Sequence, residues 1–278
     1  HPDAGKTTLT EAMLYTAGII DRQGKVEDGT TTTDFEPEEI RRKCSVSAAC
    51  APIDWNDKML NIIDVPGYFD FIGEMVGPLR VVETACIVVS GVTGFNVGAE
   101  KAFKHAVKSG VGRMFVINQM DREHANFDKV TQQLRDRHGS CVVPVLMPIG
   151  EGPDFRGVVN VLEKKAYEGA YKKSTEVPMP DSMKEKVDRA FEYLTEQAAA
   201  ADDDHHGLHH LVEVDRELVG VPAVLVVAAV GVDRTQHPGV HGALQLVFEG
   251  VAGQRGVVDL DVDLEVLVEP VGAQETDH

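Results

Sequence analysis

The fold is decided by the first eight residues, His1-Pro2-Asp3-Ala4-Gly5-Lys6-Thr7-Thr8. They match the end of a phosphate-binding loop, whose pattern is Gly, four residues, and then Gly-Lys-Ser/Thr. The first Gly of that pattern would stand before residue 1. In such a loop, backbone N–H groups at a helix N-terminus bind phosphate oxygens, the Lys reaches the β and γ phosphates, and the hydroxyl binds Mg²⁺. The predicted phosphate-binding residues are Asp3, Ala4, Gly5, Lys6, Thr7 and Thr8.

A helix is predicted directly after this loop, over residues 8–18. Leu9, Ala12, Met13 and Thr16 fall on one face at helical spacing. A Gly-Lys-Thr before a helix also arises by chance, so the loop alone leaves both interpretations open.

The composition is that of a globular protein with one large or two ordinary domains. The chain has 278 residues, of which 43% are hydrophobic and 26% charged. It has no apolar run long enough to span a bilayer and no signal peptide, so we expect no membrane partner. Four cysteines without metal-ligand spacing favour reduced thiols and a cytoplasmic location. Because the chain starts inside a motif, we expect it to be a fragment of a longer protein.

The charge is acidic and unevenly distributed. The net charge is −18, and residues 202–278 hold 15 acidic residues against three basic ones. Bulk electrostatic attraction to nucleic acid is therefore excluded, and we expect no DNA partner. The only short basic cluster near the predicted site is Arg41-Arg42-Lys43, so an RNA contact would need a local patch.

Strands and helices are predicted to alternate through the first 150 residues. Residues 21–40 are polar and rich in Gly and Thr, which indicates a long loop. The alternation predicts an α/β fold with a mostly parallel sheet, helices on both faces, and ligands at the carboxyl ends of the strands. The expected strands are 44–55, 59–63, 85–90, 113–117 and 142–148, and the expected later helices are 71–82, 98–109 and 127–138.

The remaining chain is predicted to form two further regions. Residues 151–201 suggest short strands over 155–162 and 165–168 and a helix from Asp181 to about Ala201, as a small insert subdomain. Residues 202–278 form an atypical acidic segment rich in Val and His. We therefore divide the chain into 1–150, 151–201 and 202–278.

Two more motifs follow predicted strands. Asp64-Val65-Pro66-Gly67 has the Asp-x-x-Gly form, in which the Asp holds Mg²⁺ and the Gly N–H meets the γ-phosphate. Asn118-Gln119-Met120-Asp121 has the Asn-x-x-Asp form. Its Asp can accept two hydrogen bonds from guanine N1–H and N2–H₂, which adenine does not offer. Each pattern is weak alone, but three in this order predict a guanine-nucleotide domain.

Residues 1–200 resemble the G domain of translational GTPases, a P-loop NTPase fold, and most closely that of elongation factor G and its paralogues. The resemblance implies GTP/GDP and Mg²⁺ as ligands, hydrolysis of GTP to GDP and phosphate, and the ribosome as partner. The opening also resembles the GTPase-type release factor, but the insert favours the elongation-factor branch. The residues that carry the resemblance are 3–11, 24–29, 45–49, 61–71, 118–122, 148–150 and 155–158.

Three residues depart from the family pattern. Ser45 replaces the usual Thr of the first switch, and its hydroxyl could still approach Mg²⁺ beside Thr7 and Asp64. Tyr68 replaces the His that positions the attacking water; it is a poor base at pH 7 but can orient a water, so it is the candidate catalytic residue. Gln119 replaces a Lys that covers the base, which predicts reduced nucleotide affinity.

The segment after residue 201 lacks the Ser-Ala-type loop that a translational G domain places beside guanine. One hypothesis is that it is not the natural continuation, through a frameshift or an opposite-strand reading; the alternative is a divergent acidic domain. Its two candidate strands are 221–232 and 256–269. Histidines four positions apart face together on a helix, which leaves metal binding open for His205, His206, His209 and His210.

Three functions remain open from the sequence. The first is GTP binding and hydrolysis in an elongation factor G-like translation factor. The second is nucleotide binding without turnover, in a degenerate or truncated GTPase. The third is an ATP-dependent P-loop enzyme, against which Asn118 and Asp121 argue.

Overall fold

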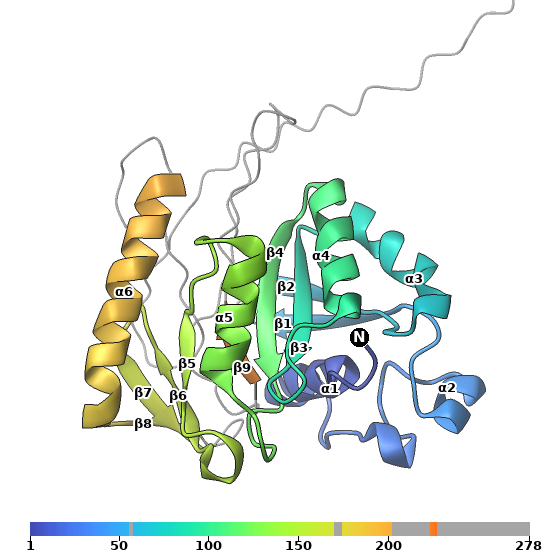
Figure 1. Ribbon diagram of the computed structural model, residues 1–278. Coiled ribbons are helices and arrows are strands. Elements are labelled where there is room, and N and C mark those ends of the chain that lie inside the picture. Colours follow the sequence, from blue (N-terminus) through green and yellow to red (C-terminus); the bar gives the residue numbers. More distant parts are fainter. Residues whose placement is uncertain (56–57, 170–173, 202–222, 227–278) are drawn as a thin grey trace, which may run out of the picture.

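The computed structural model describes residues 1–55, 58–169, 174–201 and 223–226. This part of the chain is an α/β structure of three sheets with helices packed against them (Figure 1). The strands are β1 (Ala49–Trp55), β2 (Lys58–Asp64), β3 (Thr84–Ser90), β4 (Gly112–Asn118), β5 (Leu146–Ile149), β6 (Gly157–Asn160), β7 (Lys165–Glu168), β8 (Thr175–Val177) and β9 (Ala223–Val226). The α-helices are α1 (Lys6–Thr16), α2 (Pro37–Arg42), α3 (Gly73–Val76), α4 (Val97–Ser109), α5 (Phe127–His138) and α6 (Asp181–Ala201).

The prediction of a mostly parallel sheet was wrong for the described strands. β3 and β4 pair in parallel from Thr84↔Gly112 to Ser90↔Asn118, because the helix α4 connects them as a crossover. The pairs β1–β2, β5–β6, β6–β7 and β7–β8 are antiparallel, because short connections join consecutive strands. β9 pairs antiparallel with β4 and falls inside the strand expected over 221–232.

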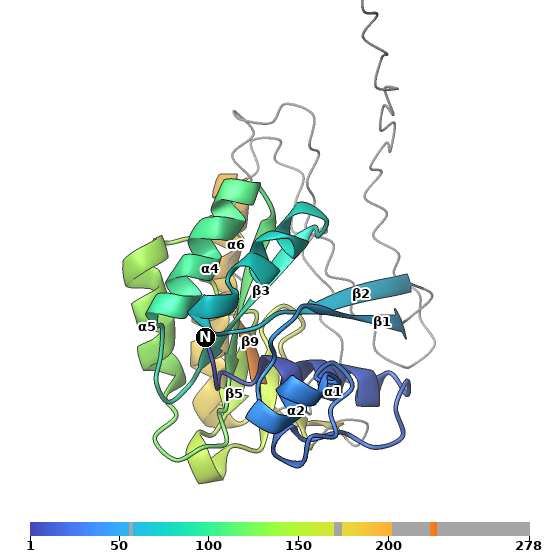
Figure 2. The same ribbon diagram turned by 90° about the vertical axis from the view of Figure 1, so that its right-hand side faces the viewer.

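Helices cover both faces of the sheet formed by β3 and β4, as the sequence predicts. Figure 2 shows α4 and α5 on one side of these strands and α1 on the other. A single hydrophobic cluster joins them through Leu9 of α1, Val89 of β3, Phe115 of β4 and Leu134 of α5. The same cluster includes Leu194 of α6, so the helix and sheet of residues 157–194 pack on the core rather than stand apart from it.

Residues 21–48 contain helical turns where a loop was predicted, and the strand that follows them starts later than predicted. A 3₁₀ turn, η1 (Val26–Asp28), and the helix α2 lie within them. The strand predicted from residue 44 begins only at Ala49. The reason is that the backbone N–H groups of Val46 and Ser47 donate to Glu39 Oε1, at 2.9 and 3.1 Å, and so do not join a ladder.

The helix predicted over 71–82 is broken into three short pieces. They are η2 (Phe69–Phe71), α3 and η3 (Pro78–Arg80). Glycine at 73 and 77 weakens a helix, and Pro78 cannot donate the hydrogen bond that would continue it. The segment after Asp64-Val65-Pro66-Gly67 is therefore a series of turns.

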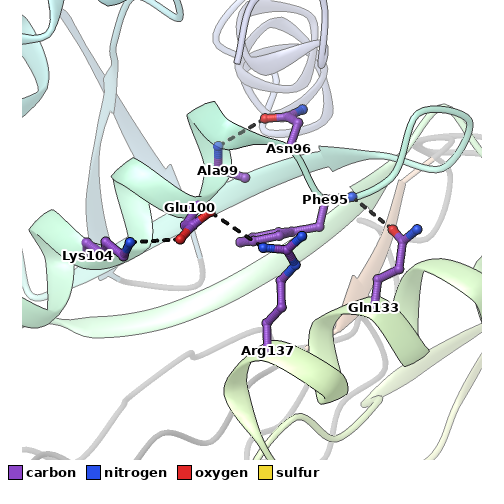
Figure 3. Close-up of polar contacts among 7 residues, drawn as sticks. All are labelled: Phe95, Asn96, Ala99, Glu100, Lys104, Gln133 and Arg137. Carbon is purple, nitrogen blue, oxygen red and sulfur yellow. Dashed lines mark hydrogen bonds and ion pairs between the residues drawn. The ribbon is translucent and has the colours of Figure 1, made fainter.

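The loop between β3 and α4 is fixed against α5 (Figure 3). Asn96 caps α4, since its Oδ1 accepts from the Ala99 N–H at 3.0 Å. The Phe95 N–H donates to Gln133 Oε1 at 3.2 Å, and Arg137 pairs with Glu100 at 3.5 Å. These contacts hold the chain that leaves the carboxyl end of β3 in one place.

In the part of the chain that the structure describes, none of the helices combines the length and the apolar character needed to cross a bilayer.

Candidate nucleotide-binding site

The phosphate loop adopts a conformation that presents backbone N–H groups. Gly5, the residue before α1, has a φ of 83°, in the left-handed region that glycine tolerates. It provides no side-chain cap, so the first turn of α1 has no side-chain acceptor there. Uncapped N–H groups at a helix N-terminus, together with its partial positive charge, form an anion-binding site.

Two neighbouring side chains at the end of β4 bind two neighbouring carbonyl groups of this loop. Asn118 Nδ2 donates to the Ala4 carbonyl at 2.9 Å. Gln119 Nε2 donates to the Asp3 carbonyl at 2.8 Å. The segment predicted to bind guanine is therefore tied directly to the segment predicted to bind phosphate.

The turn after β2 closes against the other side of the loop. A Cβ added to Gly67 would lie 2.6 Å from Lys6 Nζ and 2.7 Å from the Pro2 nitrogen. Glycine is thus required here for steric reasons, because any side chain would collide with the loop. The Lys6 ammonium also donates to the His1 carbonyl at 3.1 Å.

The structure brings together the three residues predicted to bind Mg²⁺. The hydroxyl oxygens of Thr7 and Ser45 lie 3.1 Å apart. Asp64 is buried and accepts from Thr33 Oγ1 at 3.0 Å. Its burial raises its pKa, while hydrogen bonds from Thr7 and Thr33 lower it.

Asp34 is a fourth oxygen-bearing residue at this point, and no sequence motif marks it. Its side chain is buried, and neither carboxylate oxygen has a hydrogen bond of ordinary geometry. Burial raises its pKa and so does the charge of Asp64, although the nearby Ser45 hydroxyl lowers it. No periodicity indicates a buried acid inside a polar loop, so Asp34 and Thr33 could not be found from the sequence.

These oxygen donors fit a hard divalent cation. Mg²⁺ prefers carboxylate and hydroxyl oxygens, is held by few protein ligands, and completes its shell with water and phosphate oxygens. A buried carboxylate without a partner is costly unless a positive charge compensates it. Among the described residues, no group of three or more His, Cys, Asp or Glu side chains could hold a metal alone. A cation here would therefore depend on the hydroxyls and on the ligand's phosphates.

The positive charge of Lys6 lies beside these acids. Lys6 is half-buried, and desolvation lowers its pKa, whereas the carboxylates of Asp64, Asp3 and Asp34 raise it. An ammonium that has lost part of its hydration and faces the loop is suited to bind a phosphate oxygen.

Two further buried acids, which the sequence did not single out, anchor the loop that carries Thr33 and Ser45. Glu11 of α1 is fully buried and accepts from the Gly24 N–H at 2.8 Å and the Thr32 N–H at 2.5 Å. Glu39 of α2 is buried and accepts from the Val46 and Ser47 N–H groups. Both carboxylates bind backbone, so they position the loop rather than face a ligand.

The other predicted residues differ in their exposure. Tyr68 is 42% exposed, and Asp121 and Thr8 are also exposed. Met120 is fully buried in the core, and its carbonyl accepts from the Gly152 N–H at 2.8 Å. The Met120 side chain is therefore a core group and is not on the surface that would meet a base. The Val65 and Pro66 side chains are half-buried and buried, respectively.

The histidines at 205, 206, 209 and 210 lie outside the described residues, as does the strand expected over 256–269. Cys44, Cys50, Cys86 and Cys141 are free thiols.

Comparison with known proteins gives consistent matches. The family model of the elongation factor Tu GTP binding domain matches residues 1–231, which includes β9. The chain is 34% identical over 206 residues to elongation factor G of Mycoplasma pneumoniae, and 38% identical over 207 residues to that of Gluconobacter oxydans. Each match covers 73% of this chain and 30% of the relative, so the chain spans under a third of those proteins.

A solved structure matches the fold as well. It is a crystal structure of a protein from Thermus thermophilus, with a TM-score of 0.70 and 34% sequence identity. The match covers 73% of this chain and 30% of that one.

Proposed function

The chain belongs to the elongation factor Tu GTP-binding domain family, and on this premise we propose that it binds GTP and hydrolyses it to GDP and phosphate. We propose further that it does so as part of an elongation factor G-like translation factor on the ribosome, in the cytoplasm. In this proposal residues 1–150 are the G domain, residues 151–201 an insert subdomain, and residues 202–278 an acidic segment rich in Val and His, of which β9 pairs with β4.

The observation that carries the proposal is the meeting of three distant segments at the phosphate loop. Asn118 binds the Ala4 carbonyl from one side, and Gly67 closes on Lys6 from the other. Asp64 lies at the carboxyl end of β2 and Asn118 at that of β4, the edge at which α/β sheets bind ligands. This arrangement supports a nucleotide whose phosphates lie on the loop.

The residues of this chain supply positioning and charge. The N–H groups at the start of α1 and the Lys6 ammonium bind the phosphates, and the Gly67 N–H is placed to meet the γ-phosphate. Thr7, Ser45, Asp64 and Asp34 are the residues that would hold Mg²⁺. When bound, the cation neutralises charge that develops on the transferring phosphoryl group.

Tyr68 follows Gly67 and is the candidate for orienting the attacking water. The residue as a whole is 42% exposed to solvent. The same exposure, together with the lack of an imidazole at this position, favours a second candidate function. In that alternative the chain binds guanine nucleotide without turnover.

Base selection is assigned to Asp121, which is exposed beyond β4. A carboxylate accepts from guanine N1–H and N2–H₂, whereas an asparagine at this position would present one donor and one acceptor. We expect the chain to bind GDP at least about 100-fold more tightly than ADP, because a missing hydrogen-bonding pair at a polar site is strongly disfavoured. Asp121→Asn should lower GDP affinity and raise affinity for xanthosine diphosphate.

Titration of fluorescent GDP, ADP and xanthosine diphosphate tests nucleotide binding. Equal affinity for GDP and ADP would eliminate the guanine assignment. Phosphate release from GTP, measured with and without ribosomes, tests turnover. Rates equal to the buffer rate in both cases, with intact GDP binding, would leave only the alternative of binding without turnover.

A further inference from the structure

Both the oxygen and the nitrogen of the Gln119 side-chain amide are hydrogen-bonded to other parts of the protein. The sequence predicted only a contact with the base at this position. Its Oε1 accepts from Ser90 Oγ at 2.6 Å, and its Nε2 donates to the Asp3 carbonyl at 2.8 Å. Ser90 ends β3, Gln119 follows the end of β4, and Asp3 lies in the phosphate loop. One amide thus connects three segments at the edge of the sheet.

The backbone of Gln119 indicates that this arrangement is held firmly. Its φ is 63°, in the left-handed region that a residue with a long side chain rarely adopts. Such a conformation persists only where the surrounding contacts determine it. The two side-chain bonds, and the Gln119 N–H donating to Asn118 Oδ1 at 2.8 Å, provide those contacts.

The hydroxyl group of Ser90 requires a hydrogen-bond acceptor at residue 119. It is buried, and its oxygen already accepts from the Val92 and Thr93 N–H groups at 3.3 and 3.4 Å. Its hydroxyl hydrogen therefore needs an acceptor elsewhere, and Gln119 Oε1 supplies it. A lysine at residue 119 has three donors and no acceptor, so it would leave the Ser90 hydroxyl hydrogen without that bond.

We propose that Ser90 and Gln119 form a coupled positioning pair, which holds the guanine-recognition turn on the phosphate loop and so slows the release of guanine nucleotide. This inference rests on the proposed function, because it concerns retention of the nucleotide at the same site. Ser90 acts through Gln119, and Gln119 acts through the Asp3 carbonyl. Neither residue needs to touch the reacting phosphate.

The test is a double-mutant cycle on the dissociation of fluorescent GDP from the full chain, chased with unlabelled GDP. Ser90→Ala should raise the dissociation rate about fivefold and Gln119→Met about tenfold, as expected for one and two lost hydrogen bonds. In the Gln119→Met background, Ser90→Ala should change the rate by less than about twofold, because its partner is already gone.

Three further variants separate positioning from a general loss of stability. Ser90→Thr keeps the hydroxyl and should restore the original rate. Gln119→Glu keeps the acceptor for Ser90 and loses the donor to Asp3, so it should raise the rate as Gln119→Met does, and Ser90→Ala should change the rate there by less than about twofold. Thr195→Ala removes a side-chain hydrogen bond of 2.8 Å in α6, away from the site, and should leave the rate unchanged.

The outcomes separate the proposed coupling of Ser90 and Gln119 from the proposed nucleotide binding on which it rests. If the parent chain retains GDP and Ser90→Ala multiplies the rate equally in all backgrounds, the coupled pair is wrong while the proposed function stands. If the parent chain retains no GDP, both are wrong.

Discussion

The hydroxyl oxygens of Thr7 and Ser45 lie 3.1 Å apart although 38 positions separate them in the chain. Thr7 belongs to the first turn of α1, and Ser45 to the segment between α2 and β1. Serine therefore places its hydroxyl beside Thr7, at the position where the family resemblance leads us to expect threonine. Two hydroxyls at this distance, beside the Asp64 carboxylate, would form one face of the proposed cation site.

We predict that Ser45→Ala weakens Mg²⁺-dependent retention of nucleotide. The variant should need about tenfold more free Mg²⁺ for half-maximal retention of fluorescent GTP, since one ligand oxygen is lost. Ser45→Thr is the matched control and should behave as the parent. Identical Mg²⁺ curves for Ser45→Ala and the parent would exclude Ser45 from the cation site.

Gly5→Ala is predicted to weaken nucleotide binding through a steric collision as well as through backbone strain. Gly5 has a φ of 83°, and a Cβ there would lie 2.4 Å from Asn118 Nδ2. The bond from Asn118 to Ala4 would have to break or shift. We expect GDP affinity to fall at least about tenfold, which corresponds to about 1.4 kcal/mol.

Gly139→Ala is a matched control for that substitution. Gly139 also has a positive φ, of 87°, but a Cβ there would meet nothing within 4 Å. Gly139 has a ψ of −166°, in a region that is almost restricted to glycine, so its alanine variant carries at least as much backbone strain as that of Gly5, on the order of 1–3 kcal/mol, and only Gly5→Ala carries the collision. Urea unfolding and GDP titration of both chains separate the two effects; equal losses of GDP affinity would argue against the contact.

The strand ends that carry the three motifs could be predicted from the sequence. Continuous apolar runs before Ser90 and Asn118 are typical of buried strands, and a return strand was expected before Asp64; in the structure each of the three ends within one residue of its expected end. The helices over 98–109 and 127–138 were also predicted, within one residue of their ends, because their polar and apolar residues alternate at helical spacing.

The parts that could not be predicted depend on contacts between distant side chains and backbone. Residues 44–48 contain strand-forming residues, yet Glu39 and Glu74 bind their N–H groups instead. Met120 belongs to a recognised motif, but burial places its side chain in the core. Asp34 is placed in the proposed site only because the fold brings its loop close to Asp64.

Glu11→Gln is predicted to loosen residues 24–32. Both carboxylate oxygens of Glu11 accept backbone N–H bonds, and an amide would turn an NH₂ toward one of these donors. Leaving a buried donor unpaired costs about 1–3 kcal/mol. We expect the Gly24 and Thr32 amides to exchange hydrogen faster, by about tenfold or more, in an NMR measurement.

Glu27→Gln is the control for this effect, because Glu27 is exposed in the same segment. It should leave exchange at both amides unchanged. Unchanged exchange in Glu11→Gln as well would show that the buried carboxylate does not anchor the loop.

Asp34→Asn is predicted to stabilise the nucleotide-free chain while weakening its hold on Mg²⁺ and nucleotide. Burial raises the pKa of Asp34, so the folded chain retains a proton that the unfolded chain releases between about pH 4 and that raised pKa. The contribution of Asp34 to stability therefore falls as pH rises through this window, and it stays low above it. Asparagine has no charge to bury and removes this dependence.

Urea unfolding in EDTA, repeated from pH 7 down to about pH 4, measures this effect. The variant should exceed the parent in unfolding free energy by on the order of 1 kcal/mol at pH 7, and the difference should shrink as pH falls. Asp21→Asn, at an exposed carboxylate, should show no such difference. A less stable Asp34→Asn chain at pH 7 would contradict the prediction, because the buried carboxylate would then be compensated within the protein itself.

The same variant should release fluorescent GTP faster in the presence of Mg²⁺. The reason is that the Asp34 carboxylate lowers the stability of the nucleotide-free chain but strengthens binding once a cation compensates its charge.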